Sequence, residues 1–424
     1  MANVFLPKGM RDLLPQQMIH RQRIIGAIQQ VFTRYGFEPL ETPAMERIET
    51  LTGKYGDEGD KLIFKVLSRG EGGKEGQVDQ ALRYDLTVPL ARVIAMNPQL
   101  SLPFKRSQIQ PVWRADRPQK GRFREFYQCD VDVVGAPCGL ADAECIAVVH
   151  DALVALGFTD FTIRLNHRAW LRALAVAVGA ADREVELIVA IDKLDKAGRE
   201  GVGRDLLARG FQPEQVERLW ALLDGAPLAG AEAADAELDR VEALALGLGV
   251  ERQRLRRDRS LARGLDYYTG PVFETVLTDG TVGSVSGGGR YDGLIGMFSG
   301  RDIPAVGVSL GLERLVVLME ERGMLAASNT STRVWVTVFD PACEPAALQA
   351  VTAFRQAGVA AEISLAEGKL GKQLKAADKR GVSWVIIAGP DEVAAGVVKL
   401  RDLRSGQDQT LPLHEAVAVV RSAG

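Results

Sequence analysis

The first part of the chain shows the apolar spacing of a helix, followed by an extended stretch. Apolar residues at helical spacing from about Pro15 to Tyr35 predict an amphipathic helix that Gly36 ends. The next stretch, FEPLETPAME, carries Pro39 and Pro43, which exclude a helix and suit a sheet edge or an interface. Ordinary packing explains a helix and a proline strand equally well, so this pair assigns no function by itself.

Apolar and polar residues alternate with the period of a strand between Gln108 and Val134. The halves IQPVWRAD and RFREFYQCDVDVV predict a long hairpin joined by the turn RPQKG. Alternation places six residues of the second half on one face: Arg122, Arg124, Phe126, Gln128, Asp130 and Asp132. This face suits a polyanionic, aromatic ligand, because arginine grips phosphate oxygens with two donors and a phenyl ring stacks on a flat base. A solvated face with ordinary charged pairs is the alternative.

A strand followed by a helix is predicted in QALRYDLTVPLARVIAMNP. The strand covers Ala81 to Tyr84, and the short helix ends at Asn97. Asp85 and Thr87 stand at the junction between them. They either cap the helix or point into a pocket and bind a cationic amine, with Asp85 supplying the charge. The pattern leaves both roles open.

Helical, alanine-rich patterns run from about Arg168 to Arg240 between two strand-rich parts of the chain. They predict a helical insertion, residues 168–250, that divides a catalytic domain into residues 1–167 and 251–325. The basic run ERQRLRRDRS, residues 251–260, is typical of a solvated helix face. From about Thr332 strands and helices alternate, which predicts a separate small α/β domain over residues 332–424.

The stretch SLARGLDYYTGPVFE, residues 260–274, concentrates an arginine and two adjacent phenols. Arg263, Tyr267 and Tyr268 place a fixed charge and two hydroxyl groups within six residues. This composition favours a binding site, although tyrosines beside a strand are often packing residues. Further on, the triple glycine from Gly287 to Gly289 permits a close approach of backbone to a ligand or marks a bulge.

Two basic features have more than one explanation. Arg314 falls in the first turn of a predicted helix, where a cation is unfavourable to the helix dipole, so it is either functional or an exposed side chain. Five basic residues near the end of the chain have roughly helical spacing: Lys369, Lys372, Lys375, Lys379 and Arg380. They can meet phosphates or form a solvated helix face.

Composition limits the class of protein. The length of 424 residues predicts two or three domains, and 46% hydrophobic with 25% charged residues is typical of a globular, soluble protein. A net charge of −3 argues against a nonspecific polyanion binder. No segment has the ~18 apolar residues of a membrane span, nor does the amino terminus have the pattern of a signal peptide, so a cytoplasmic location is expected. Four cysteines without a close pair and four scattered histidines argue against zinc and structural disulfides.

Taken in order, these motifs resemble those of the histidyl-tRNA synthetases, a family of class II aminoacyl-tRNA synthetases, over nearly the whole chain. The proline strand at Pro43, the hairpin from VWRAD to REFYQCD, and GLER at residues 311–314 match patterns general to class II. RGLDYYT at 263–269, GGGRYDGL at 287–294 and LRYDLTVPLAR at 82–92 match the histidine enzymes.

The resemblance implies both fold and reaction. The expected fold is an α+β catalytic domain on a mainly antiparallel sheet, with a helical insertion and a carboxy-terminal α/β anticodon-binding domain. The expected reaction activates L-histidine with ATP and Mg²⁺ to histidyl-adenylate, then transfers the histidyl group to the 3′-terminal adenosine of the histidine tRNA. A cytoplasmic homodimer joined through the first motif is implied, without zinc or an organic cofactor.

The resemblance also implies roles for particular residues. Arg114 would contact the α-phosphate of ATP, with Arg263 opposite it on the histidine side; these are the catalytic pair. Arg122 would meet the terminal phosphates, and Phe126 and Arg314 would enclose adenine.

Histidine and tRNA contacts follow from the same resemblance. The α-amino group would be held by Asp85, Thr87 and Gln128. The imidazole would be held by Asp132 and Tyr268, with Tyr267 beside them. The tRNA contacts implied are Arg117, Gln119 and Lys120 in the hairpin loop, and Lys372 and Lys375 in the last domain.

Some positions depart from the commonest bacterial pattern. Residues 85–87, Asp-Leu-Thr, stand where many bacterial members carry a glutamate, and Gln128-Cys129-Asp130 is similar to the eukaryote-type branch, whereas the short RPQKG loop is similar to bacterial members. The acids keep their charge, so the departure concerns recognition of the tRNA acceptor end and leaves catalysis in place.

Two rival functions remain to be tested. One is a regulatory paralogue that partners an ATP phosphoribosyltransferase; such proteins typically lack the anticodon-binding domain and catalytic residues, both of which this sequence has. The other is a class II synthetase for another amino acid, against which RGLDYYT and GGGRYDGL argue.

Overall fold

The structure, a computed structural model, describes residues 4–262, 267–278, 280, 283–325, 330–365 and 369–423. The chain forms two units, one of residues 1–11 and 23–324, the other of residues 12–22 and 325–424. The helix α1, Pro15–Arg34, where the first apolar pattern predicts one, begins in the second unit and ends in the first.

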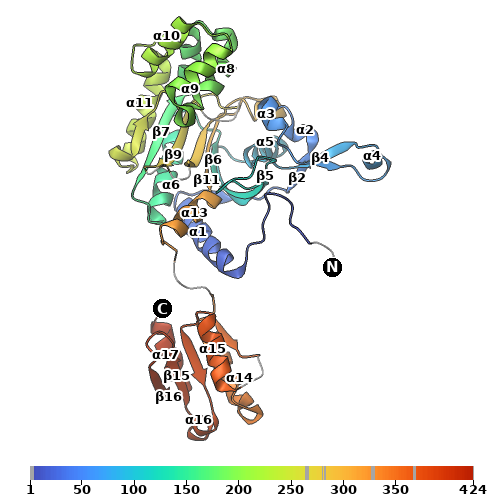
Figure 1. Cartoon of the computed structure of the whole chain (residues 1–424), viewed down its shortest axis with the longest axis vertical. Coiled ribbons are helices and arrows are strands. Elements are labelled where there is room, and N and C mark those ends of the chain that lie inside the picture. Colours follow the sequence, from blue (N-terminus) through green and yellow to red (C-terminus); the bar gives the residue numbers. More distant parts are fainter. Residues whose placement is uncertain are drawn as a thin grey trace. The chain divides into compact units, whose positions relative to one another are not determined.

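An eight-stranded sheet is the framework of the first unit (Figure 1). Its strands, in spatial order, are β1 (Glu38–Pro39), β5 (Phe104–Trp113), β6 (Glu125–Val134), β11 (Ala305–Gly311), β10 (Ser284–Arg290), β9 (Pro271–Leu277), β7 (Phe161–His167) and β8 (Leu255–Arg257). Only the two outermost pairs, β1 with β5 and β7 with β8, are parallel among these strands. The prediction of a mainly antiparallel sheet is therefore confirmed, and Pro39 lies on an edge strand, where its missing N–H costs no ladder bond.

One long helix covers the middle of this sheet. The helix α6, Leu140–Ala155, packs against β6, β10 and β11 on one side and against α11, Glu232–Gly247, on another. Because it is enclosed by both, its apolar residues occur around most of its circumference, with Ile146, Val149 and Leu153 all buried. Helix α13, Leu312–Glu321, follows β11 directly and packs against β6 and β10.

The predicted hairpin is confirmed, with β5 and β6 paired antiparallel from Phe104 opposite Val134 to Trp113 opposite Glu125. The prediction that Arg124 shares the polar face of β6 is wrong. The strand begins only at Glu125, so alternation does not reach Arg124. Its Nε instead donates to the carbonyl of Asp116 at 3.1 Å, and the side chain follows that bond.

A second, three-stranded sheet carries the segment that leads to Asp85. It consists of β2 (Met45–Arg47), β4 (Val78–Leu82) and β3 (Lys65–Leu67), with the short helices α2 (Ile48–Leu51), α3 (Gly56–Asp60) and α4 (Glu71–Lys74). Strand β4 ends at Leu82, before the predicted end at Tyr84. The next residue, Arg83, is buried, and its guanidinium donates to the carbonyls of Thr42 and Pro111, at 2.6 and 2.8 Å. Helix α5, Thr87–Met96, follows.

The helices predicted after Arg168 are present and share an apolar core that includes Trp170, Leu206 and Leu219. They are α7 (Arg168–Ala177), α8 (Glu184–Ile191), α9 (Leu194–Ala208), α10 (Pro213–Leu223) and α11, with the 3₁₀ turn η1 (Ala181–Arg183). Figure 1 shows α11 beside β7, which it contacts.

The basic run from Glu251 to Ser260 is not the solvated helix face that was predicted. It forms the 3₁₀ turn η2, Arg252–Arg254, and the edge strand β8. Leu255 is buried opposite Ile163 of β7. Arg257 forms an ion pair with Asp239 of α11, which compensates the charge of the arginine on this strand. The partner lies outside residues 251–260, so the composition of that run did not reveal it.

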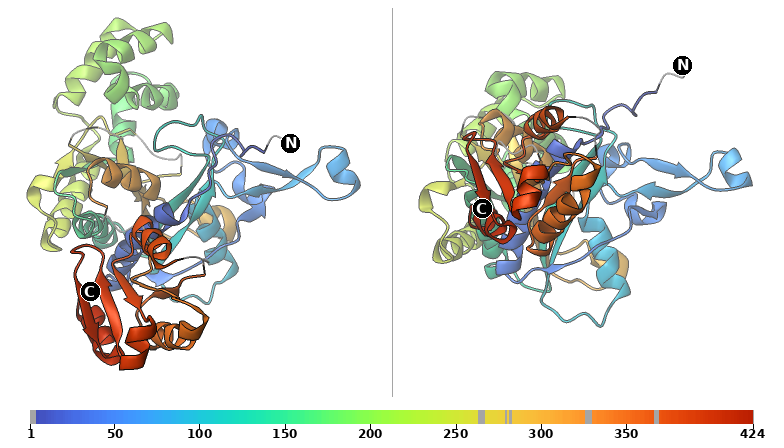
Figure 2. Two further views of the ribbon diagram at one scale, coloured as in Figure 1. Left: turned by 60° about the horizontal axis from the view of Figure 1, so that its bottom comes forward. Right: turned by 90° about the horizontal axis from the view of Figure 1, so that it is seen from below.

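The second unit has the alternation of strand and helix that the sequence predicts (Figure 2). Its sheet has the order β13 (Ala361–Ile363), β12 (Val334–Val336), β14 (Trp384–Ile387), β15 (Val398–Asp402) and β16 (Asp408–Leu411). Its helices are α14 (Glu344–Gln356), α15 (Leu370–Lys379), α16 (Pro390–Ala395) and α17 (Leu413–Ser422), with the 3₁₀ turn η3 (Pro341–Cys343). Val334 and Val336 pack in the core with Phe354 of α14, whereas Trp335 packs in another with Ala377 of α15.

The glycines of β10 differ in the space around them. A side chain at Gly288 would place its Cβ 2.3 Å from the carbonyl oxygen of Gly307 on β11, whereas a Cβ at Gly287 would meet nothing within 4 Å. A bulge does occur in β10, but between Ser284 and Ser286. Gly288 therefore permits close strand packing, and the short helix α12, Gly296–Ser299, begins shortly after the strand.

We expect Gly288→Ala to destabilise the first unit by at least the ~1–3 kcal/mol typical of overpacking, because the atoms it meets are backbone. Gly287→Ala is the matched control and should stay within ~1 kcal/mol of the wild type, because its Cβ has space. Urea unfolding of both variants measures the difference. Equal free energies of unfolding would contradict the packing argument.

Candidate functional site

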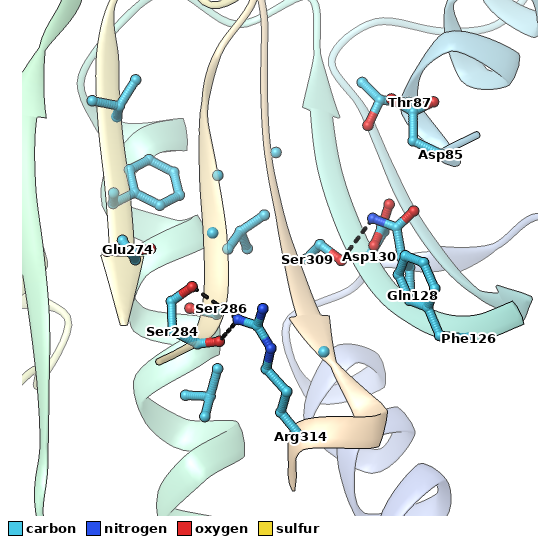
Figure 3. Close-up of a pocket in the computed structure, with 18 of the residues that line it drawn as sticks. Asp85, Thr87, Phe126, Gln128, Asp130, Glu274, Ser284, Ser286, Ser309 and Arg314 are labelled. Carbon is cyan, nitrogen blue, oxygen red and sulfur yellow. Dashed lines mark hydrogen bonds between the residues drawn. The ribbon is translucent and has the colours of Figure 1, made fainter. Parts of the chain in front are cut away.

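A cavity of about 340 Å³ opens on the face of the large sheet. Its walls come from β6, β10, β11, the first turn of α13, the segment before α5, and Tyr267 with Tyr268. Figure 3 shows residues of these elements pointing into one space. The volume is that of a site for a small molecule.

The structure brings ten residues predicted for substrate contacts to this cavity. They are Asp85, Thr87, Arg114, Arg122, Phe126, Gln128, Asp132, Tyr267, Tyr268 and Arg314. Arg263, the remaining catalytic prediction, lies outside the described residues. Gln119 and Lys120 line a separate groove with Gly9 and Met10, Arg117 lies in the same hairpin loop, and Lys372 and Lys375 lie on α15 of the second unit.

Asp85 is buried at one end of the cavity and is held by three donors. Its Oδ1 accepts bonds from the hydroxyl of Tyr55 and the N–H of Val88, both at 3.0 Å, and its Oδ2 accepts one from Tyr267 at 3.1 Å. Burial raises the pKa of this carboxyl group, and the bond from Val88 and the charge of Arg114 oppose the rise. Asp85 thus bonds the first turn of α5 and also lines the cavity, so both of its predicted roles are compatible.

Tyr55 is a site residue that sequence reasoning missed. It lies between α2 and α3 in the stretch GKYG, and its ring packs at a tilt of 44° against Tyr84, with 4.6 Å between the centroids. Gly53 and Gly56 flank it with φ of 72° and 70°. A tyrosine between two glycines in left-handed conformation was the available signal, because such turns hold a side chain in a fixed direction.

Arginine and aromatic side chains form another wall of the cavity. The Nε of Arg114 donates to the carbonyl of Tyr84 at 3.0 Å, which fixes the side chain where β5 ends. Its guanidinium lies 4.3 Å from the Tyr84 ring centroid and 5.2 Å from that of Phe126. Arg122 also lines the cavity, and it lies in the hairpin turn, where its backbone forms an isolated β-bridge with Gln119. This wall attracts an anionic ligand with a planar ring.

Arg314 is directed across the sheet from the first turn of α13. Its Nη1 donates to the carbonyl oxygen of Ser284 and, at 3.1 Å, to the hydroxyl of the same residue (Figure 3). These oxygens on β10 compensate for the unfavourable position in the helix dipole. The exposed alternative is excluded, since the side chain is half-buried and lines the cavity.

The floor of the cavity presents hydrogen-bond acceptors. Gln128 Nε2 donates to Ser309 Oγ at 3.0 Å (Figure 3). The hydroxyl of Tyr291 donates to Asp132 Oδ1. Within the described part of the chain, three buried oxygens of the floor accept no hydrogen bond: Gln128 Oε1, Asp130 Oδ1 and Asp132 Oδ2, the last of which lies 3.2 Å from Arg106 Nη1 in an ion pair. Buried acceptors without donors are costly, so this end favours a ligand rich in N–H groups.

The lining of the cavity therefore combines two kinds of charged group. The buried acids Asp85, Asp130 and Asp132 are together called the acidic end, and Arg114 lies close enough to oppose the raised pKa of Asp85. Arg122, Arg314 and Phe126 also line the cavity, and Glu274 lies on the side of Arg314 (Figure 3). This combination suits a ligand pair with an amine and phosphates. Among the residues with described positions there is no cluster of three or more His, Cys, Asp or Glu side chains able to hold a metal ion. Across the same residues, none of the helices is both long and apolar enough to cross a membrane.

Known protein families match most of the chain. The family model described as Histidyl-tRNA synthetase matches residues 9–315, and the one described as Anticodon binding domain matches residues 332–423. A relative from Cytophaga hutchinsonii named histidine-tRNA ligase is 42% identical over 445 residues, covering 97% of this chain and 98% of its own. One of the same name from Aeropyrum pernix is also 42% identical, with 98% and 97% covered.

Solved structures of similar fold include a histidyl-tRNA synthetase from a Nostoc species. It has a TM-score of 0.85 and 32% identity, with 100% of both chains covered. A structure from Bacillus halodurans, titled ATP phosphoribosyltransferase regulatory subunit/histidyl-tRNA synthetase, has a TM-score of 0.72 at 23% identity and covers 90% of this chain and 97% of its own. At that identity the likeness concerns the fold alone.

We expect Tyr55→Phe to destabilise the first unit by ~1–3 kcal/mol when Asp85 is ionised, because one donor to a buried carboxylate is lost. The lost bond favoured the charged form, so the pKa of Asp85 rises further and the loss grows as pH rises. Urea unfolding at about pH 5 and about pH 8 tests both the size and the sign.

Tyr35→Phe is the matched control for this change. Its hydroxyl also donates to a carboxylate, Asp151, at 2.9 Å, but that side chain is 38% exposed and water can replace the bond. The control should therefore lose less stability. Equal losses for the two variants at both pH values would contradict the role given to Tyr55.

Proposed function

The chain belongs to the histidyl-tRNA synthetase family, and we propose from that premise how its cavity performs the reaction of a histidine-tRNA ligase. The enzyme activates L-histidine with ATP and transfers the histidyl group to the 3′-terminal adenosine of the histidine tRNA. The observation that carries the assignment of the site is that one cavity is lined both by buried carboxylates and by three arginines with an aromatic ring.

ATP lies against the arginine wall. Phe126 and Arg314 enclose adenine, Arg122 meets the terminal phosphates, and Arg114 contacts the α-phosphate. ATP enters as its magnesium complex, so Mg²⁺ is part of the substrate. The guanidinium carbon of Arg114 lies 5.2 Å from the ring centroid of Phe126, and this proximity supports the placement.

The first step joins the two substrates. An oxygen of the histidine carboxylate attacks the α-phosphorus, the bond to pyrophosphate breaks, and histidyl-adenylate forms. The protein supplies orientation and stabilises the charge that develops on the phosphate oxygens. Arg114 provides one cation, and the sequence motif places Arg263 opposite it.

Histidine lies at the acidic end. Asp85, Thr87 and Gln128 hold the α-ammonium group, while Asp132 and Tyr268 hold the imidazole with Tyr267 beside them. An isosteric apolar amino acid would leave these polar groups unpaired, and rejection of that kind reaches roughly 10⁴-fold. The buried oxygens of Gln128 and Asp132 without partners in the described chain support this orientation.

The proposal also covers the partners and the location of the enzyme. The partners are the histidine tRNA and a second copy of the chain, and the location is the cytoplasm. Arg117, Gln119 and Lys120 approach the acceptor end from the hairpin loop, and Lys372 and Lys375 of α15 contact RNA. Two copies associate through the first motif, the helix α1 and the strand around Pro43. The match of residues 332–423 to an anticodon-binding family supports the RNA contact.

Two rivals are separated by one assay, ATP–pyrophosphate exchange with each amino acid in turn. Exchange with histidine alone supports the ligase with the specificity proposed here. Exchange with a different amino acid would indicate a class II synthetase of other specificity, and no exchange would indicate a regulatory paralogue. The presence of Arg114 and Arg314 in the cavity argues for exchange.

We expect Asp132→Ala to lower histidine-dependent exchange by roughly 100-fold or more, because the ring loses a charged acceptor in a desolvated site. The affinity for ATP should change little, since Asp132 lies at the acidic end. The measurement is KM for histidine and for ATP in the exchange assay. Unchanged selectivity for histidine would refute this role.

Asp142→Asn is a matched control for the loss of a buried acid. Asp142 is fully buried and paired with Arg290 at 2.6 Å, but it does not line the cavity. Its replacement should lower stability without a selective rise in the histidine KM.

A further inference from the structure

Asp130 is a buried acid in the cavity to which the proposed function gives no task. It precedes Asp132 by two residues on β6, so both side chains leave the same face of the strand. Each is 2% exposed, and both line the cavity. Two carboxylates this close in a desolvated site repel each other, which calls for a compensating cation.

That cation is Arg106, which is fully buried on β5 directly opposite Asp132. Its Nη1 lies 3.2 Å from Asp132 Oδ2 and 3.9 Å from Asp130 Oδ2. Its Nη2 donates to the carbonyl of Leu86 at 2.8 Å, which holds the guanidinium in place. One cation thus serves two acids, and the cluster formed by Asp130, Asp132 and Arg106 carries one net negative charge when both acids are ionised.

We propose that Asp130 is a positioning residue for recognition of the histidine ring, because by sharing Arg106 it leaves Asp132 with uncompensated negative charge for the ring N–H. The inference rests on the proposed placement of the ring at Asp132. With Asp130 uncharged, Arg106 and Asp132 become a neutral pair, and Asp132 becomes a weaker acceptor.

The surroundings of Asp132 leave it one oxygen for this purpose. Its Oδ1 accepts a hydrogen bond from the hydroxyl of Tyr291. Its Oδ2 forms the ion pair with Arg106, whose Nη1 lies 3.2 Å away, but accepts no hydrogen bond from the residues that the structure describes. A side chain at Gly307, which pairs with Asp132 across β6 and β11, would place a Cβ 2.0 Å from Oδ1. The glycine therefore gives the carboxylate its room, and Oδ2, which faces Arg106 without a hydrogen bond from it, keeps the capacity to accept a ligand N–H.

The charge of the cluster changes near neutral pH. Burial raises the pKa of Asp130 to about 7, and Arg106 of β5 opposes the rise. Asp132 of β6 raises it, a hydrogen bond from Ser309 of β11 lowers it, and Asp85 raises it. Asp130 also raises the pKa of the nearby phenol Tyr268, after burial and the charges of Asp132 and Asp85. Burial raises the pKa of Asp132 as well, so the two acids titrate as a pair. As pH falls through about 7 the pair takes up a proton, and the cluster loses one negative charge.

The test is the pH dependence of KM in ATP–pyrophosphate exchange with two amino acids. Histidine is one, but its own ring gains a proton with a pKa of about 6.5 and offsets the loss of charge in the cluster. The second is 1,2,4-triazolylalanine, which keeps a ring N–H and stays neutral in this range. For the wild type, we expect KM for the triazole to rise below about pH 7, with a slope of at most about tenfold per pH unit, the limit for uptake of one proton, and to level off about tenfold above its value at about pH 8.

Asp130→Asn should behave at all pH values as the wild type does at low pH. At about pH 8 its KM for the triazole and for histidine rises about tenfold, the size of a lost charge-assisted interaction, and the pH dependence of the triazole KM disappears. The KM for ATP stays unchanged. Asp130→Glu, which restores the carboxylate, should restore part of the pH dependence, whereas Asp142→Asn should keep the wild-type profile.

Three outcomes overturn the proposal. A flat triazole profile in the wild type would mean that no group near the ring titrates, and this result does not depend on any variant folding. A pH step that persists in a folded Asp130→Asn variant would assign the step to another acid such as Asp85. A rise in the KM for ATP equal to that for histidine would indicate a general structural defect. If the wild type exchanges histidine and Asp132→Ala does not, these outcomes refute only the role of Asp130; absence of histidine exchange in the wild type refutes the proposed function and with it this inference.

Discussion

The burial of ionised carboxylates is the constraint on which the cavity depends. Asp85 and the pair Asp130–Asp132 are almost fully removed from water, and burial raises the pKa of each. A buried charge is stable only with donors or a cation close to it. Those partners come from separate parts of the fold: Tyr55 from the segment after α2, Tyr291 from beyond β10, and Arg106 from β5. The buried acids are therefore stabilised only when these separate segments of the fold are assembled correctly around them.

Close strand packing makes room for these acids. Gly288 lets β10 approach β11, and Gly307 of β11 leaves the space that the Asp132 carboxylate fills. Glycine in a strand costs conformational entropy and removes a packing side chain. A side chain at Gly307 would occupy the space of Asp132 Oδ1, the atom that accepts the hydrogen bond from Tyr291. The glycines therefore lower the strand propensity of these residues but make room for the polar floor of the cavity.

The parts of this site that could be predicted are those set by local periodicity. Alternation in β6 places Phe126, Gln128 and Asp132 on one face, because a strand reverses side-chain direction at each residue. Arg124 could not be placed in this way, because the strand begins one residue later and a bond to Asp116 decides its direction. Tyr55 and Arg106 were missed for a related reason: each gains its role from an acid 30 or 26 positions away, and no local pattern encodes such a distance.

The different partners of the acids explain how one cavity can orient an amino acid. Asp85 is bonded by neutral donors, two phenols and a backbone N–H, so its charge is stabilised without being cancelled. It remains a counter-ion for a ligand cation, which fits an α-ammonium group. Asp132 shares Arg106 with Asp130, so the protein's own cation already occupies part of this position but compensates only one of the two acids. A ring N–H, which needs a strong acceptor but brings no obligatory charge, fits that position better. The acids of this cavity thus differ in the charge around them, and this difference gives histidine one preferred direction.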